Sequence, residues 1–289
     1  MRLLEWNDFI GGAFADTALS LGIGVFDGVH RGHQALIQEL TASEALPTII
    51  TFRQNPLQTL RKHDFSGNIY SLERKTGLLS AFGVKMTVLI DFSLKFSKLK
   101  GSEFIGLLLR SCRLGQLVLG RNFHCGCKLD TGIAEIAELA GRDTAIRTVE
   151  PVAERGAAIS SSRIRSAIRA GNFAEAAHFL GRNAEIDLAG LPMEPVLSGT
   201  GRCLVYSAAE FRRILPPDGT YGVMAYGCTD APENAANADI QAEGCVCQKR
   251  EMVISVNKGK VIIPGNDGKG FNPVRLEFYE PYMPFSKLG

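Results

Sequence analysis

The sequence has little that would attract a polyanion or a lipid surface. Its 289 residues carry 32 Lys and Arg against 30 Asp and Glu, which gives a formal net charge of +2. Basic residues form no long run, so we expect no nucleic-acid partner. No stretch holds the roughly 18 consecutive apolar residues of a membrane-spanning helix, and the first residues lack the pattern of an export signal. We therefore expect a cytoplasmic protein without a membrane partner, and the sequence leaves self-association open.

Cysteine is too sparse for a disulfide framework in a chain of this length. The seven cysteines are expected to be reduced thiols, because no export signal precedes them. Two Cys-x-Cys pairs, Cys125/Cys127 and Cys245/Cys247, have a spacing found in zinc sites, but they lie far apart in the sequence. A structural zinc ion needs two such pairs close in space. We therefore favour ordinary thiols and keep zinc as the alternative.

Histidine is scarce as well, yet two of the five histidines stand three residues apart at one turn. The apolar run Leu19–Phe26 predicts a strand, and the helical periodicity of Gly32–Ala45 predicts a helix after it. His30 and His33 lie where the strand gives way to the helix. Side chains three residues apart share a helix face, so both imidazoles can reach one ligand. Because amide groups and the positive end of the helix dipole converge there, we predict a phosphate site.

The residues before the histidines complete a longer motif, Gly-Val-Phe-Asp-Gly-Val-His-Arg-Gly-His. Its glycines leave room for a bulky anion to approach the backbone. The motif resembles that of nucleotidyltransferases with a His-x-Gly-His sequence and, more closely, the FAD synthetase half of the bacterial bifunctional riboflavin kinase/FAD synthetase family. The resemblance implies that His30 and His33 are catalytic. It also implies that the nucleotide is bound by Gly24, Phe26, Asp27, Gly28 and Gly32.

The hydrophobic pattern divides the chain into an α/β part and a mostly-β part. In the first, apolar runs alternate with helical patterns, which predicts a Rossmann-like, doubly wound parallel sheet. Its expected strands are Leu19–Phe26, Thr48–Phe52, Met86–Ile90, Gln116–Gly120 and Ala145–Val149, and its expected helices are Gly32–Ala45, Leu72–Phe82, Ser102–Cys112, Gly132–Ala140, Ser161–Ala170 and Phe173–Leu180.

After residue 182 short β-like runs and frequent Gly and Pro predict a small barrel-like domain. Within it the sequence indicates one short helix at Ser207–Ile214 and a long polar loop at Thr229–Glu243. We place the boundary at residue 184, which gives domains 1–184 and 185–289.

Two other predicted strand ends carry asparagines. Gly120-Arg121-Asn122-Phe123-His124-Cys125-Gly126 is compatible with a plain loop. It resembles the family stretch Gly-x-Asn-Phe-x-Phe-Gly at the nucleotide site, with Cys125 in place of the second aromatic residue. Asn122 is thereby implied in nucleotide binding, where its amide can both donate and accept. Thr51-Phe52-Arg53-Gln54-Asn55-Pro56 resembles the family's Thr-Phe-x-Pro-His-Pro, and Asn55, in the place of the histidine, is implied in flavin binding by position alone.

The helix expected at Ser161 begins with the sequence Ile-Ser-Ser-Ser-Arg-Ile-Arg. A serine N-cap would account for it, but hydroxyls, amides and arginines at one helix start also suit a polyphosphate. The stretch resembles the family's Ser-Ser-Thr/Ser-x-Ile-Arg, which implies that Ser161, Ser162 and Arg165 hold the β- and γ-phosphates of ATP. Arg163 is expected to face solvent. Leu72-Glu73-Arg74-Lys75 also resembles a family stretch, and we expect it to be structural.

The C-terminal domain lacks what a riboflavin kinase of this family presents. Gly199-Thr200-Gly201-Arg202 begins like the first kinase motif, but no Pro-Thr-Ala-Asn follows it, and Asn-x-Gly-x-Arg-Pro-Thr and Glu-x-His are absent. Without the Thr and Asn that hold magnesium and phosphates, phosphoryl transfer to riboflavin loses its electrostatic centre. We predict a degenerate kinase domain without this activity.

The sequence thus predicts an FMN adenylyltransferase that forms FAD and pyrophosphate from FMN and ATP. Mg²⁺ is the implied cofactor; it would bridge phosphates and keep most of its waters, so no metal ligand from the protein is predicted. Two alternatives remain open. One is a sister adenylyltransferase that acts on NMN or phosphopantetheine, and the other is a non-catalytic flavin- or nucleotide-binding regulator.

Overall fold

The computed structural model describes residues 1–12, 14–60, 65–142, 144–198, 201–208, 212–229, 246–264 and 271–278. The chain forms two compact units, Met1–Phe65 with Lys75–Ile159, and Ser66–Arg74 with Ser160–Gly289. A short segment from the first third of the chain therefore belongs with the C-terminal half. These units divide the chain before residue 184, and the sequence-based domain boundary at 184 stays a prediction.

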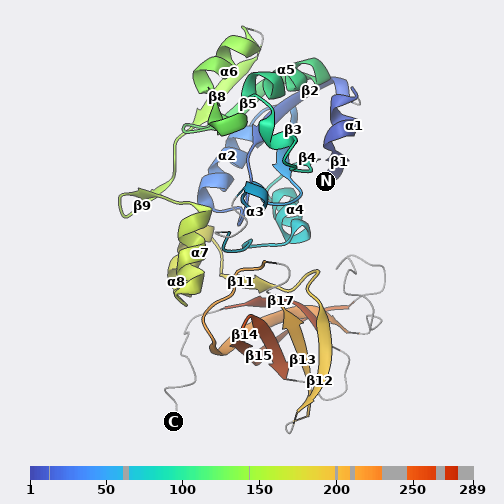
Figure 1. The fold of residues 1–289 in the computed structure, drawn as a ribbon, viewed down its shortest axis with the longest axis vertical. Coiled ribbons are helices and arrows are strands. Elements are labelled where there is room, and N and C mark those ends of the chain that lie inside the picture. Colours follow the sequence, from blue (N-terminus) through green and yellow to red (C-terminus); the bar gives the residue numbers. More distant parts are fainter. Residues whose placement is uncertain are drawn as a thin grey trace. The chain divides into compact units, whose positions relative to one another are not determined.

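The first unit is built on a six-stranded parallel sheet with the order β1-β4-β3-β2-β5-β8 (Figure 1). Its strands are β1 Arg2–Glu5, β2 Phe14–Ile23, β3 Leu46–Phe52, β4 Met86–Ile90, β5 Cys112–Gly120 and β8 Ala145–Val149. From β2 the chain steps to β3 and β4 on one side and then crosses to β5 and β8 on the other. The switch point lies between β2 and β5, where such sheets bind ligands outside the carboxyl ends of the strands. The predicted Rossmann-like sheet is confirmed.

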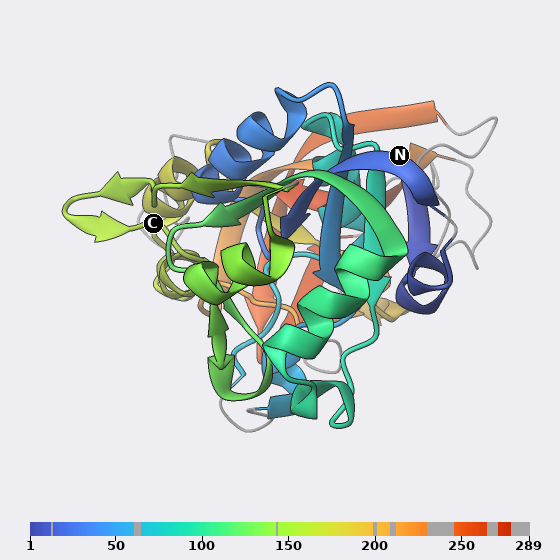
Figure 2. The ribbon, with the colours of Figure 1, turned by 90° about the horizontal axis from the view of Figure 1, so that it is seen from above.

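Helices cover both faces of this sheet because residues along β2 alternate in character. Gly22 faces α2 (Arg31–Thr41), so closely that a Cβ on this glycine would lie 2.8 Å from the Leu40 side chain. Leu21 points to the other face and joins Trp6 and Phe104 in the main core. Those two aromatic residues come from α1 (Trp6–Ile10) and α5 (Gly101–Ser111), and α5 runs along this face of the sheet in Figure 2.

The remaining helices and short strands of the first unit lie between or after the strands of the parallel sheet in the sequence. The other helices are α3 Pro56–Leu60, α4 Leu72–Ala81, whose first turn belongs to the second unit, and α6 Ile133–Ala140. Two short antiparallel pairs follow β5 and β8: β6 His124–Cys125 with β7 Thr131–Gly132, and β9 Ala153–Glu154 with β10 Ala157–Ala158. No helix in the described ranges is long and apolar enough to cross a membrane.

The second unit combines two helices with a seven-stranded antiparallel sheet, in the order β11-β17-β14-β15-β16-β13-β12. The helices are α7 Ser161–Arg169 and α8 Phe173–Leu180, and the strands are β11 Glu185–Asp187, β12 Met193–Ser198, β13 Gly201–Ser207, β14 Gly219–Thr229, β15 Val246–Asn257, β16 Lys260–Pro264 and β17 Asn272–Glu277. Phe173 of α8 stacks on Phe278 with ring centroids 3.7 Å apart, which packs the helix pair on the sheet. The predicted mostly-β C-terminal domain is confirmed.

The short helix expected at Ser207–Ile214 is wrong for the residues that are described. Ser207 ends β13, and the chain at Arg213 instead forms a bridge with Asn68. The Asn68 amide donates to the carbonyl of Arg212 at 2.6 Å, and the Ile214 amide donates to the carbonyl of Asn68 at 2.9 Å. These long-range bonds satisfy backbone groups that a helix would have paired locally. The loop expected at Thr229–Glu243 lies outside the described residues except for Thr229, which ends β14.

Candidate active site

The turn that carries the two histidines has an unusual backbone. It follows β2 at the switch point, and Phe26, Gly28 and Val29 have positive φ angles of 54°, 84° and 40°. This left-handed region costs a non-glycine residue on the order of 1–3 kcal/mol, and it is rarest for β-branched residues such as valine. Two hydrogen bonds hold the turn: the Val29 amide donates to the Phe26 carbonyl at 3.2 Å, and Gln34 Nε2 donates to the Val29 carbonyl at 2.9 Å. The surrounding structure therefore fixes a strained turn in one shape.

The imidazoles of His30 and His33 are stacked, with centroids 3.7 Å and planes 20° apart. His30 is the buried N-cap of α2, and its Nδ1 accepts a hydrogen bond from the His33 amide at 3.4 Å. That bond assigns the proton of the neutral His30 ring to Nε2. The Phe26 ring lies 5.0 Å from the half-buried His33 ring. The pairing of the imidazoles agrees with the sequence spacing, although His30 precedes the helix and does not lie on its face.

The glycines of the turn are needed for reasons within the turn itself. A Cβ on Gly32 would lie 3.2 Å from two ring atoms of His30, and a Cβ on Gly24 would lie 3.0 Å from the ring of Phe26. Gly28 has the positive φ already described. Two of the three glycines thus admit neighbouring rings, and the approach of an anion to them stays a prediction.

A buried lysine lies at the carboxyl ends of β2 and β3, next to this turn. Lys75 of α4 donates from Nζ to the Phe52 carbonyl at 2.8 Å, to Thr51 Oγ1 at 3.2 Å and to the Val25 carbonyl at 3.4 Å. Burial lowers the pKa of this ammonium to about 8, and the charge of Asp27 opposes that shift. Sequence reasoning placed Lys75 in a structural stretch. Its position, three residues after Leu72, is one where helical spacing calls for an apolar residue.

The two asparagines lie at the carboxyl ends of strands that neighbour β2. Asn55 follows β3, is 7% exposed, and accepts from the Leu57 amide at 3.1 Å through Oδ1, so its side chain caps α3. Asn122 is exposed in the turn after β5. That turn ends at Gly126, where a Cβ would lie 2.1 Å from the Gly101 nitrogen. The structure thus shows that Asn55 caps α3 and that Asn122 lies in an exposed turn. The contacts of both asparagines with a ligand stay predictions.

In the second unit, the start of α7 carries the predicted polyphosphate residues. Ser160 is the N-cap and accepts from the Arg163 amide at 3.3 Å, while Ser161 is half-buried and Ser162 exposed. Arg165 is 6% exposed, and its Nε donates to the Gly67 carbonyl at 2.8 Å.

Two contacts of this helix were not predicted from the sequence. Gly67, which receives Arg165, has a φ of +109°, and a Cβ there would lie 2.7 Å from the Arg212 carbonyl oxygen. Arg163, which was expected to face solvent, is half-buried, and its guanidinium lies 4.3 Å from the centroid of the Phe179 ring. This cation–π contact on α8 occupies the side chain.

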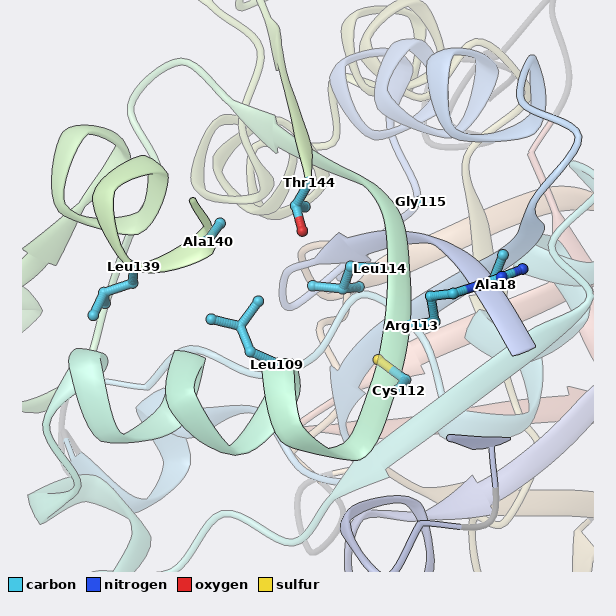
Figure 3. A pocket seen from close by; sticks show the side chains of 9 residues that line it. All are labelled: Ala18, Leu109, Cys112, Arg113, Leu114, Gly115, Leu139, Ala140 and Thr144. Carbon is cyan, nitrogen blue, oxygen red and sulfur yellow. The ribbon is translucent and has the colours of Figure 1, made fainter. Parts of the chain in front are cut away.

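Two other features bear on where a ligand or metal would bind. Among the described residues, no three or more His, Cys, Asp and Glu gather to hold a metal ion. Cys245 lies outside those residues, so the zinc alternative is untested. An open depression of about 610 Å³ is lined by Ala18, Leu109, Cys112, Arg113, Leu114, Gly115, Leu139, Ala140 and Thr144 (Figure 3). It lies at the amino end of β5, whereas the histidine turn lies at the carboxyl edge of the sheet.

The doubly wound sheet carries the histidine turn and the start of α2 at its switch point. This arrangement is typical of α/β enzymes that bind nucleotides. The sequence model of the FAD synthetase family matches residues 14–163. The chain belongs to the FAD synthetase family, and it is an adenylyltransferase.

Two curated relatives illustrate this membership. The chain is 30% identical over 224 residues to the bifunctional riboflavin kinase/FMN adenylyltransferase of Escherichia coli K12, covering 73% of this chain and 69% of the relative. It is 28% identical over 169 residues to the FAD synthetase of Listeria monocytogenes, covering 57% of this chain and 69% of the relative.

A solved structure supports the fold over almost the whole chain. The crystal structure of a protein described as a macrolide-efflux protein from Streptococcus pneumoniae superposes with a TM-score of 0.72. The match covers 96% of this chain and 89% of that chain at 24% identity. At this identity the likeness shows the fold alone.

Proposed function

We propose that this enzyme is an FMN adenylyltransferase that converts FMN and MgATP to FAD and pyrophosphate, and that it has no riboflavin kinase activity. The observation that carries the first part is the stacked His30–His33 pair at the start of α2. The printed names of the relatives, FMN adenylyltransferase and FAD synthetase, support the choice of FMN as acceptor.

The reaction needs no protein nucleophile. A phosphate oxygen of FMN attacks the α-phosphorus of ATP in line, the bond from that phosphorus to the β-phosphate oxygen breaks, and pyrophosphate leaves. Such a step depends on positioning and on stabilising negative charge. His30 and His33, with the amide groups at the start of α2, stabilise the charge that develops on the α-phosphate. Magnesium enters as part of MgATP.

The other site residues hold the two ends of the reacting system. Ser161, Ser162 and Arg165 bind the pyrophosphate as it departs, and the Gly67 carbonyl sets the direction of the Arg165 side chain. Contacts to the nucleotide come from the turn and from the loop after β5, and a contact to the flavin comes from Asn55. The nucleotide-binding set is Gly24, Phe26, Asp27, Gly28, Gly32 and Asn122.

The loss of kinase activity is inferred from the missing motifs of residues 185–289. The relative from Escherichia coli is named for both activities, whereas the relative from Listeria monocytogenes is named for FAD synthetase alone. Both arrangements therefore occur among similar proteins. The absence of Pro-Thr-Ala-Asn after Gly201-Arg202 favours the second arrangement here.

The decisive experiment incubates the purified protein with MgATP and either FMN or riboflavin, and separates the flavins by chromatography. We expect FAD from FMN and no product from riboflavin. A parallel reaction without ATP controls for flavin that co-purifies. FMN or FAD formed from riboflavin would overturn the kinase inference. No product from FMN would overturn the adenylyltransferase assignment to this acceptor and direct the test to NMN, to phosphopantetheine and to binding without turnover.

A further inference from the structure

We propose that Lys75 is a positioning residue for adenylyl transfer: its ammonium joins the ends of β2 and β3 and thereby holds the strained turn that presents His30 and His33. This inference rests on the proposed function for its consequence in turnover. Its structural part, that the lysine holds the turn, can be tested without any activity.

The contacts of Lys75 converge on the residue just before the turn. The Val25 carbonyl accepts from Lys75 Nζ at 3.4 Å and from Thr51 Oγ1 at 2.9 Å. The same ammonium donates to Thr51 Oγ1 at 3.2 Å and to the Phe52 carbonyl at 2.8 Å. One cation therefore links the last residues of β3 to Val25, after which Phe26 turns into the left-handed region.

If packing were its only role, a lysine at this buried position would be energetically unfavourable compared with an apolar side chain. Lys75 is 8% exposed and Thr51 is fully buried. A buried charge is stable only with several good partners, and replacing it by an apolar side chain of similar volume is often neutral or stabilising for the fold. The charge of Asp27, within the turn, acts on the same ammonium. The ammonium thus interacts with the turn both through the backbone and through a carboxylate that belongs to it.

The strained backbone of the turn explains why a residue such as Lys75 is needed to hold it. Val29 and Phe26 hold positive φ angles, and residues in this region keep them only when their surroundings over-determine the backbone. A displacement of about 1 Å in a group that orients a reacting phosphate can cost about a hundredfold in rate. Loosening the end of β2 would move His30 and His33 together with the amides of α2.

The test compares Lys75→Met, which keeps the length and removes the charge and donors, with Lys85→Met at an exposed lysine of the same unit. We expect kcat for FAD formation to fall by about 10- to 100-fold in Lys75→Met, with KM for FMN and ATP changed less than about threefold and the thermal midpoint unchanged or raised. Hydrogen exchange of a peptide spanning residues 24–33 should become faster in this variant. Lys85→Met should match the parent protein in all three measurements.

The outcomes separate the two proposals. If the parent protein forms no FAD from FMN, the proposed function fails, and hydrogen exchange alone decides whether Lys75 holds the turn. Exchange and kcat both unchanged in Lys75→Met would overturn the inference, as would faster exchange throughout the unit, because that indicates a general structural role. If Lys75→Met does not fold, Thr51→Val decides: lower kcat with faster exchange confined to 24–33 supports the inference, and parent-like values overturn it.

Discussion

Arg74 and Glu185, which are 111 residues apart in the chain, are joined by two hydrogen bonds. The Nε–Oε1 distance is 2.6 Å, and the Nη2–Oε2 distance is 3.1 Å. Arg275 adds a third cationic contact to the same carboxylate, with Nη1 3.4 Å from Oε2. The Glu185 side chain is 2% exposed. This one buried carboxylate attaches the segment 66–74 to β11 and β17 of the second unit.

Glu185→Gln should therefore destabilise the protein. Glutamine keeps one acceptor oxygen, but it removes the negative charge and replaces the second oxygen by an NH2 group that faces the guanidinium groups. Breaking a buried ion pair costs about 3–5 kcal/mol. Because Arg74 and Arg275 are 24% and 23% exposed at their side chains, solvent recovers part of that, and we expect a loss of about 2–4 kcal/mol. Urea unfolding measures it. The matched control is Glu150→Gln, at an ion pair with Arg121 that is 67% and 64% exposed, which should change stability by less than about 1 kcal/mol.

His33→Ala should reduce the turnover of FMN to FAD by about a hundredfold or more, the order expected for losing one preorganised donor. The fold should remain, because the His33 ring contributes to the stacked pair at the turn and not to the main core. Turnover by chromatography and thermal unfolding by circular dichroism check the two parts. His178→Ala, on the exposed side of α8, serves as the histidine control. Parent-like turnover in His33→Ala would remove this histidine from the mechanism.

The pH dependence of stability should reveal the buried ammonium of Lys75. Burial lowers its pKa in the fold to about 8 from the ordinary lysine value of 10.5. Between these values the unfolded chain holds a proton that the folded chain has lost, so stability rises with pH through this window. The gain is about 3 kcal/mol when complete. It should appear as a difference between the parent protein and Lys75→Met in urea unfolding at pH 7.5 and pH 10. All other titratable groups are common to both proteins, so the difference isolates Lys75, and a difference that does not vary with pH would contradict the prediction.

Cys112 and Cys125 should react slowly with an alkylating reagent. Burial raises the pKa of both thiols to about 11, and Asp130 adds to the shift at Cys125. At pH 8 the thiolate, which is the reactive form, is at least about a hundredfold scarcer than for an unperturbed thiol. Peptide mass spectrometry after timed iodoacetamide treatment measures the two rates, with urea-unfolded protein as the reference. A rate for Cys112 that equals the unfolded rate would show that this thiol is open to solvent.

Local patterns were sufficient for the parallel sheet and insufficient at its edges. The expected strands at Met86–Ile90 and Ala145–Val149 match β4 and β8. Met86–Ile90 is a continuous apolar and β-branched run, and in Ala145–Val149 only Arg147 interrupts such a run. β1 and α1 were not anticipated, because a four-residue strand has too few positions to show a period. The expected strand at Leu19–Phe26 was shifted: β2 begins at Phe14 and ends at Ile23, before the left-handed residues of the turn.

The candidate site, like the fold, could be predicted from the sequence only in part. The His30–His33 pair was predictable because the spacing of two side chains across a helix start is a local property. Lys75 was not, since its role depends on the carbonyls of Phe52 and Val25, which lie 23 and 50 residues away in the chain. The failed helix at Ser207–Ile214 has the same cause, because Asn68 supplies the pairing that replaces it.

The discontinuous second unit limits how this protein could be taken apart or recombined. A fragment that stops at residue 184 retains 66–74 but loses β11, and with it Glu185 for Arg74 and the Asp187 carboxylate that accepts from the Ser71 amide at 2.5 Å. The Arg74 guanidinium and the Ser71 amide, which both have these partners in the whole chain, would lose them in the fragment. They would then be exposed to water, or the fragment would aggregate. Swapping C-terminal halves between relatives would meet the same obstacle. The modularity that the sequence boundary suggests therefore holds only if residues 66–74 are exchanged along with the half that binds them.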